Sequence, residues 1–228
     1  MKRRILLPLL VLAIVLPVAA QANIGFKSYF SGDPAVNKIA ITVDDLYGLD
    51  HLESILDLCK TYGIPMTFFP VGAVIKEEDA ALWQRIVDEG HEIGNHTFSH
   101  PNILKITSQQ LERQLTRTQK ALNAVLREPY PLRLFRPPFG KYDRTGQGST
   151  EILGYLGYHY IILWTSDVTD PEQVFKETEN GSILLFHTNQ KDVRCLTTLL
   201  PMLLDAGFEP VTVSELLQLP APESGEPD

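Results

Sequence analysis

Two histidines separated by three residues, His96 and His100, are the part of the sequence best suited to chemistry. If the backbone between them makes a helical turn, their side chains project from one face and can bind one metal ion. The spacing alone is weak, because it also occurs by chance on solvated helix faces. Asp44 and Asp45 strengthen it, because they follow an apolar run, 38–43, that is typical of a strand. Of two adjacent carboxylates, one can bind a metal ion while the other stays free as a base.

Two histidines and one aspartate would leave a coordination position open for water. That pattern is typical of a catalytic zinc site and not of a closed structural one. The competing interpretation is two unrelated polar clusters that never meet in the fold. We therefore expect a metal site, provided that the fold brings the two clusters together.

The first 22 residues have the pattern of a secretory signal peptide. A positively charged segment, 2–4, precedes an apolar stretch, 5–18, and an A-x-A cleavage motif ends at Ala22. The apolar stretch is short for a membrane span and contains two prolines. We expect cleavage near Ala22, export to the periplasm or the extracellular space, and no stable membrane insertion afterwards. An uncleaved anchor helix is the alternative.

The charge balance argues against nucleic acid as a partner. The chain has 28 acidic and 20 basic residues, and its net charge of −8 becomes −11 once the three basic residues of the signal peptide are removed. No basic patch is present, and an acidic surface repels phosphate backbones. A neutral or cationic substrate such as a sugar polymer fits better. About 200 residues remain after cleavage, which is enough for one domain, and we expect a monomer.

The domain is expected to span 23–219. The last residues, 220–228, are rich in Pro, Glu, Gly and Ser and lack an apolar period, so they are typical of an acidic, disordered tail. Cys59 and Cys195 both lie in apolar helical patterns. We expect free buried thiols there, with a disulfide as the alternative that export permits.

Strand and helix patterns alternate through the mature chain. Strands are expected at 39–43, 66–71, 92–95, 134–136, 160–164, 182–187 and 210–213, and helices at 49–62, 78–89, 108–126, 149–156, 174–178, 193–206 and 214–217. Seven such units favour an α/β fold with one TIM-barrel-like (β/α)7 barrel over an open sheet. The carboxyl ends of barrel strands carry the active site. Polar residues collect at or just beyond those ends: Asp44, Asp45, His96, Arg136, Asp167 and His187.

Five ordered motifs then become apparent. They are Thr42-Val43-Asp44-Asp45-Leu46, His96-Thr97-Phe98-Ser99-His100, Arg136-Pro137-Pro138-Phe139-Gly140, Asp167-Val168-Thr169-Asp170-Pro171 and Leu185-Phe186-His187. Any one of them is weak, but five in this order are strong. Together they make the chain resemble the polysaccharide deacetylases of the NodB-homology type, carbohydrate esterase family 4. The resemblance covers nearly the whole mature chain and implies a distorted NodB-type (β/α)7 barrel.

The resemblance also implies a function and a metal centre. The expected enzyme is a metal-dependent hydrolase that removes N-acetyl groups from a glycan such as chitooligosaccharide or peptidoglycan. Its metal would be Zn²⁺, with Co²⁺ and Ni²⁺ as alternatives. Asp44 would be the general base, and Arg136 would lie beside it and keep it ionised. The metal ligands would be Asp45, His96 and His100.

The remaining roles that the resemblance implies concern the leaving group and the substrate. His187 would be the general acid that protonates the departing amine. Asp170 matches the family aspartate that hydrogen-bonds this histidine, and Asp167 is the nearby alternative. The backbone N–H of Phe139 would stabilise the oxyanion. Pro138 and Tyr142 are further expected substrate contacts; Tyr142 could stack on a sugar ring, with burial as the alternative.

Two departures from the family pattern concern the substrate site. Leu46 replaces the glycine that follows the aspartate pair, and Gly48 could supply flexibility two positions later. Pro171 replaces the tryptophan of the fourth motif, which lines the substrate groove in the family. Two alternatives therefore stay open: O-acetyl ester or N-formyl hydrolysis on the same scaffold, and a degenerate relative that binds glycan without turnover.

Overall fold

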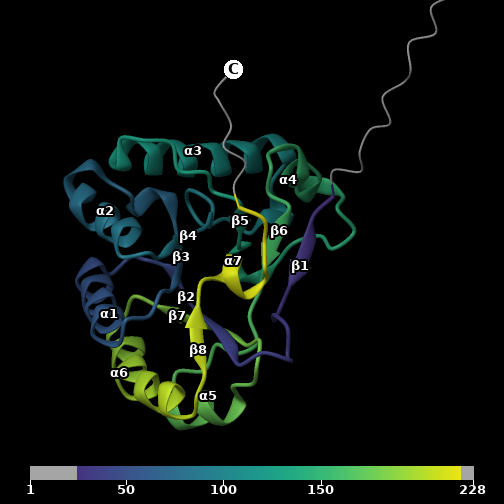
Figure 1. Ribbon diagram of the computed structural model, residues 1–228. Helices are drawn as coiled ribbons and strands as arrows, with labels where there is room; N and C mark the ends of the chain where they lie inside the picture. Colours follow the sequence, from purple (N-terminus) through teal and green to yellow (C-terminus); the bar gives the residue numbers. More distant parts are fainter. Residues whose placement is uncertain (1–24, 222–228) are drawn as a thin grey trace, which may run out of the picture.

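Strands and helices alternate along the residues that the computed structural model describes, 25–221 (Figure 1). The expected signal peptide and residues 222–228 of the expected tail lie outside this range. The strands are β1 (Lys27–Tyr29), β2 (Lys38–Asp45), β3 (Thr67–Pro70), β4 (Glu92–Ile93), β5 (Leu134–Phe135), β6 (Tyr160–Ile162), β7 (Ile183–His187) and β8 (Glu209–Val211). The α-helices are α1 (Leu49–Tyr62), α2 (Ala80–Asp88), α3 (Ser108–Leu126), α4 (Ile152–Tyr155), α5 (Pro171–Glu177), α6 (Gln190–Asp205) and α7 (Val213–Leu216).

All strand pairs are parallel and form two sheets. One has the order β4-β3-β2-β7 with β8 also beside β2, and the other has the order β1-β6-β5. Two isolated parallel bridges join the sheets: Asn95 pairs with Phe135, and Ser166 pairs with Leu184. The strands thus surround one interior without forming a single continuous hydrogen-bonded barrel. The expected α/β barrel is confirmed in this distorted form, whereas β1 is a strand that the pattern does not predict.

Side chains that point inward from the strands of both sheets pack together in the interior. β2 shows the alternation that places them there, with Ala40, Thr42 and Asp44 on the face opposite Ile41 and Val43. One buried cluster draws on strands of both sheets and on α7: Ala40, Phe69, Leu134, Ile162, Ile183, Val211, Val213 and Leu216. α7 therefore contributes to this core, and the inward positions closer to the carboxyl ends of the strands are free to carry polar groups.

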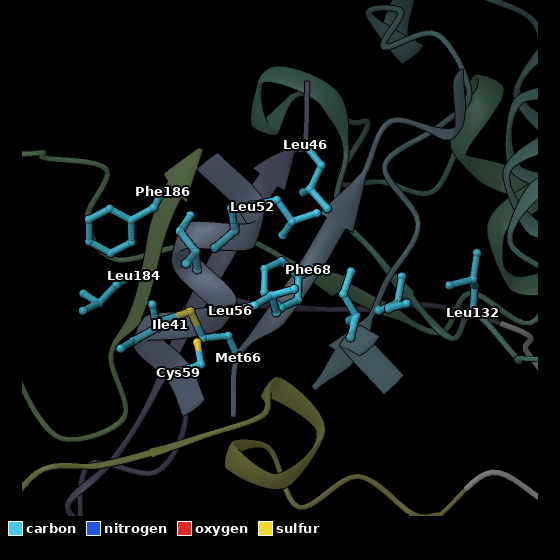
Figure 2. Packing of buried hydrophobic residues seen from close by; sticks show 14 of the residues in the cluster. Ile41, Leu46, Leu52, Leu56, Cys59, Met66, Phe68, Leu132, Leu184 and Phe186 are labelled. Carbon is cyan, nitrogen blue, oxygen red and sulfur yellow. The ribbon is translucent and has the colours of Figure 1, made fainter. Parts of the chain in front are cut away.

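The outward faces of the strands pack against the helices. Ile41, Phe68 and Phe186 share one buried cluster with Leu52 and Leu56 of α1, part of which Figure 2 shows, and all five are fully or almost fully buried. Burying one such side chain contributes about 1.5–3 kcal/mol, so this layer supplies much of the stability of the strands that carry the site.

Several expectations about the elements are confirmed by the structure. α1 and α3 have the expected bounds, and both cysteines are free and buried. α6 begins at Gln190, three residues before the expected start, because Asn189 caps it by accepting hydrogen bonds from Lys191 N and Asp192 N. Within the described residues, no helix is long and apolar enough to cross a membrane.

Candidate metal centre and active site

The two aspartates at the end of β2 have different surroundings. Asp44 points into the barrel and is only 3% exposed. The next two residues, Asp45 and Leu46, have left-handed backbone conformations with φ of 67° and 62°. This is uncommon for residues other than glycine and turns the chain sharply where the strand ends. The carboxylates of Asp44 and Asp45 can therefore take different roles.

Asp45 meets both histidines of the His-x-x-x-His motif. Its Oδ1 lies 3.5 Å from Nε2 of His96 and 3.4 Å from Nε2 of His100. One ligand atom from each of these residues lies within 4.8 Å of the others, and this is the one such group among the described residues. The structure thus brings together the three residues that the sequence predicts as ligands.

The chemical state of these side chains fits a cation. Nδ1 of His96 lies 2.7 Å from the Arg136 carbonyl oxygen, which can only accept, so Nδ1 carries a proton and the neutral ring presents its lone pair at Nε2. Oδ1 of Asp45 is buried and has no hydrogen-bond partner. Burial and the neighbouring His96 lower the pKa of His100. Burial alone would raise the pKa of Asp45, but His96 and His100 hold that pKa below its usual range. Neutral histidine and charged aspartate are the forms that bind a divalent ion.

The loop that carries the two histidines is not a helical turn, so that part of the expectation is wrong. Thr97 and His100 have positive φ, 67° and 55°, and the segment is irregular. Side chains hold its shape: Asn95 accepts from Thr97 N, and Thr97 Oγ1 accepts from His100 N. Gln114 of α3 accepts from the backbone N–H groups of Phe98 and Ser99 at 2.9 and 2.8 Å. Polar side chains of the loop and of α3 therefore set the histidine spacing.

Arg136 holds Asp44 in the barrel interior. Its Nη1 donates to Asp44 Oδ1 at 2.7 Å and to Thr42 Oγ1 at 2.7 Å. Its other nitrogens donate to the carbonyl oxygens of Ile162 and Leu163, and the side chain is fully buried. A buried pair in which every guanidinium nitrogen donates a hydrogen bond keeps its geometry. The predicted contact between Arg136 and Asp44 is confirmed.

His187 lies at the end of β7, next to the end of β2. Its side chain is 44% exposed, so it can reach a substrate. The nearby carboxylate of Asp192 is the largest cause of a raised pKa of the His187 ring; burial opposes the rise, and the charges of Asp44 and Asp45 add to it. A raised pKa keeps the imidazole protonated closer to neutral pH, which suits a proton donor.

Comparison with known proteins agrees with this site. A family model described as polysaccharide deacetylase matches residues 31–161. A peptidoglycan-N-acetylglucosamine deacetylase of Bacillus cereus is 32% identical over 195 residues, which cover 79% of this chain and 88% of the relative. The chain belongs to the polysaccharide deacetylase family.

Solved structures of family members share the fold. The Bc1960 peptidoglycan N-acetylglucosamine deacetylase superposes with a TM-score of 0.74 at 26% identity, covering 84% of this chain and 92% of that chain. BA3943 of Bacillus anthracis, described as a CE4 family pseudoenzyme, gives a TM-score of 0.72 at 25% identity, covering 83% of this chain and 68% of that chain. Fold similarity alone therefore does not separate an active member of this family from an inactive one.

The fourth motif of the family departs from expectation here. Asp170 is exposed and caps α5 by accepting a hydrogen bond from Gln173 N at 2.9 Å. Asp167 is also exposed. Within 25–221, the only carboxylate within 4 Å of a His187 ring nitrogen belongs to Asp192, 3.7 Å from Nδ1. The expectation that Asp170 or Asp167 contacts His187 is therefore wrong, and Asp192 is a residue that the motifs do not reveal.

The expected substrate contacts also separate in the structure. Phe139 is 58% exposed, and its ring lies 4.5 Å from that of His100, so it stands beside the metal centre. Pro138 is buried, and Tyr142 is only 8% exposed, with its hydroxyl donating to Ser28 Oγ. The expectation that a sugar stacks on Tyr142 is therefore wrong, because the ring is buried; the alternative, burial, is confirmed.

Leu46 itself adopts the left-handed conformation that the family glycine would favour, and its side chain is fully buried. Gly48 does not supply the turn, because its φ is −99°. A Cβ on Gly48 would instead lie 2.5 Å from the Thr188 carbonyl oxygen, so this glycine permits a close backbone approach.

The turn after Asp45 leaves the side chain of Tyr47 62% exposed, and partial burial together with the charge of Asp45 raises the pKa of Tyr47. Tyr47 is a further residue at the site that the motifs do not reveal.

Proposed function

We propose that this chain is an exported, metal-dependent deacetylase that hydrolyses N-acetyl groups of a glycan. The observation that carries the proposal is the division between the aspartates: Asp45 shares a ligand cluster with His96 and His100, whereas Asp44 pairs with Arg136. The acidic composition and the deacetylase relatives support a neutral, N-acetylated sugar polymer as substrate.

Asp45, His96 and His100 would hold the metal, for which Zn²⁺ fits two histidines and one carboxylate, with Co²⁺ and Ni²⁺ as alternatives. A divalent ion held there polarises a carbonyl and makes water a stronger acid. This step needs a base whose own carboxylate is free of metal. Asp44 supplies it, 3.8 Å from Nε2 of His96 and paired with Arg136.

The other steps fall to residues around the mouth of the barrel. The backbone N–H of Phe139 would donate to the oxyanion that forms when water attacks the amide carbon. His187 would donate a proton to the departing amine, because an unprotonated amine is a poor leaving group. Tyr47 and Phe139, the two exposed aromatic side chains beside the ligands, would stack on sugar rings.

Acetate release tests this proposal. Purified protein, loaded with Zn²⁺, Co²⁺ or Ni²⁺, is incubated with chitooligosaccharides, peptidoglycan fragments, O-acetylated xylan and an N-formyl sugar. We expect release from an N-acetylated glycan that a chelator abolishes and added metal restores. Faster cleavage of the O-acetyl or N-formyl substrate would instead assign the chain to one of those activities.

Metal content separates an active enzyme from a degenerate glycan-binding member. We expect about one equivalent of divalent metal in the wild type and none in Asp45→Ala, because that change removes the carboxylate that lies next to both histidines. Stoichiometric glycan binding without metal or turnover would contradict the proposal.

Mass analysis of the secreted protein tests export with cleavage near Ala22, and light scattering tests the expected monomer.

A further inference from the structure

Asp192 is buried next to His187 at the start of α6. Its side chain is 1% exposed, and its Oδ2 accepts hydrogen bonds from the His187 backbone N–H at 2.6 Å and from Asn189 Nδ2 at 3.0 Å. The same Oδ2 lies 3.7 Å from Nδ1 of the His187 ring. Its Oδ1 is buried with no hydrogen-bond partner. Asp192 thus contacts both the backbone and the ring of one residue.

The hydrogen bonds alone do not explain why this residue carries a charge. An asparagine in the same place could accept from both N–H donors with its amide oxygen. A buried carboxylate with one unpaired oxygen is costly, even where the N-terminal end of a helix favours negative charge. A cationic imidazole beside the carboxylate would offset that cost, because opposite charges 3–4 Å apart attract strongly inside a protein.

We propose that Asp192 is the positioning residue for His187: its carboxylate holds Nδ1 of the ring and leaves Nε2 to donate a proton to the leaving amine. Contacts of this kind are often long without substrate and tighten when substrate binds. In this chain the carboxylate therefore comes from the helix after β7 and not from the fourth motif, which precedes β7. Asp170 caps α5, as described above.

The electrostatics of the site agree with this geometry. Asp192 makes the largest contribution to the raised pKa of His187, ahead of burial, which opposes it, and of Asp44 and Asp45 on β2. His100, on the ligand loop, is the other titratable group that interacts with His187, and its positive charge would act in the opposite direction. Among the carboxylates of the described residues, that of Asp192 is the one within 4 Å of a His187 ring nitrogen.

The test is Asp192→Asn, which keeps an acceptor for both hydrogen bonds but removes the charge. In metal-free protein, NMR of the ring nitrogens should show the pKa of His187 falling by about one unit, the smallest effect expected on losing an opposite charge at this distance. With metal, the rate on an N-acetylated glycan should fall by about 10-fold or more, and the alkaline limb of the pH profile should move to lower pH. Hydrolysis of an aryl acetate should change little, because its leaving group departs without a proton.

Asp170→Asn is the matched control, because asparagine caps a helix as well as aspartate does. It should leave the His187 titration and the amide rate unchanged. An unchanged His187 titration in folded Asp192→Asn, or equal losses on amide and aryl ester, would overturn the proposal. If Asp192→Asn does not fold, the wild type decides: a His187 pKa at or below that of an ordinary histidine would also overturn it.

The inference rests on the proposed function for its rate measurements only. If no glycan is deacetylated, the proposed function fails, but the NMR titration of His187 still reports whether Asp192 controls its proton. The two failures are therefore distinguishable.

Discussion

Asp44 at the end of β2 and His187 at the end of β7 are directly paired in the register of these two adjacent parallel strands. The group that would accept a proton and the group that would donate one are thus held by one hydrogen-bonded ladder. Neither position depends on a flexible loop. The loop-borne residues are His96 and His100, whose spacing is set instead by Gln114 and by the side chains of the loop.

Asp44→Asn should separate the roles of the two aspartates. We expect metal content to stay near one equivalent, because Asp44 lies outside the ligand cluster, while glycan deacetylation is nearly abolished, because an amide cannot accept the proton of water. Metal analysis and acetate release on the same sample measure both quantities. Loss of metal from Asp44→Asn would show that Asp44 is a ligand and that this division of roles is wrong.

His187→Asn should affect amides and activated esters differently. We expect the rate on an N-acetylated glycan to fall by about 10²–10⁴, the range typical of a positioned proton donor. The loss on an aryl acetate should be much smaller, and metal content should not change. In the wild type, activity should fall at alkaline pH as His187 loses its proton; because its pKa is raised, that fall should begin above the pKa of an ordinary histidine. Equal losses on both substrates would mean that His187 acts structurally or as a ligand.

The clustering of Asp45, His96 and His100 and the pairing of Asp44 with Arg136 could be predicted from the sequence, because the motifs that carry these residues follow strand ends. Their roles as ligands and base stay predictions that the family resemblance implies. Asp192 could not be predicted with the helix start placed at 193, which leaves this residue outside the helix. Asn189, a good N-cap followed by an aspartate in the first turn, is the signal that could have found it. The burial of Tyr142 depends on contacts with Ser28 and Phe26, more than a hundred residues away, and no local pattern reports such packing.

Tyr47→Ala should weaken glycan binding without emptying the metal centre. Its ring is mostly exposed next to Asp45, and stacking of a sugar on an aromatic ring contributes about 1 kcal/mol, so we expect KM to rise several-fold with kcat nearly unchanged. Tyr47→Phe is the matched control and should behave as the wild type, because stacking needs the ring and not the hydroxyl. Steady-state kinetics on a chitooligosaccharide measure this. If Phe and Ala variants lose the same amount, the hydroxyl is what matters and stacking is wrong.

Leu46 offers a test of strain against packing. Removing a fully buried leucine side chain costs about 3–5 kcal/mol, whereas a left-handed conformation costs a residue other than glycine about 1–2 kcal/mol. Packing is the larger effect, so Leu46→Gly should be less stable than the wild type. It should nevertheless be more stable than Leu46→Ala by about 1 kcal/mol, since only glycine relieves the strain. Urea unfolding compares the three proteins; an alanine variant more stable than the glycine variant would contradict the strain.

His91 should make the stability of the protein sensitive to acid. Burial lowers its pKa to about 4, with Arg85 also lowering it and Glu89 opposing. Its Nδ1 accepts a hydrogen bond from Met66 N at 3.0 Å, which requires that nitrogen to be unprotonated. In the unfolded chain the ring has an ordinary pKa of about 6.5. Between these values the unfolded chain takes up a proton that the folded protein does not, so stability falls as the pH is lowered through this window.

The full loss over that window is roughly 3 kcal/mol, because each pKa unit corresponds to about 1.4 kcal/mol. His91→Asn keeps an acceptor for Met66 N but cannot be protonated in this range. We expect it to be somewhat less stable than the wild type at pH 7.5, because the packing of the ring against Phe68 is lost. Its free energy of unfolding should then fall less between pH 7.5 and pH 4.5 than that of the wild type. Urea unfolding at both pH values measures this difference, in which the contributions of the other titrating groups cancel. Equal falls in the two proteins would show that the buried ring at position 91 is protonated as readily in the folded protein as in the unfolded chain.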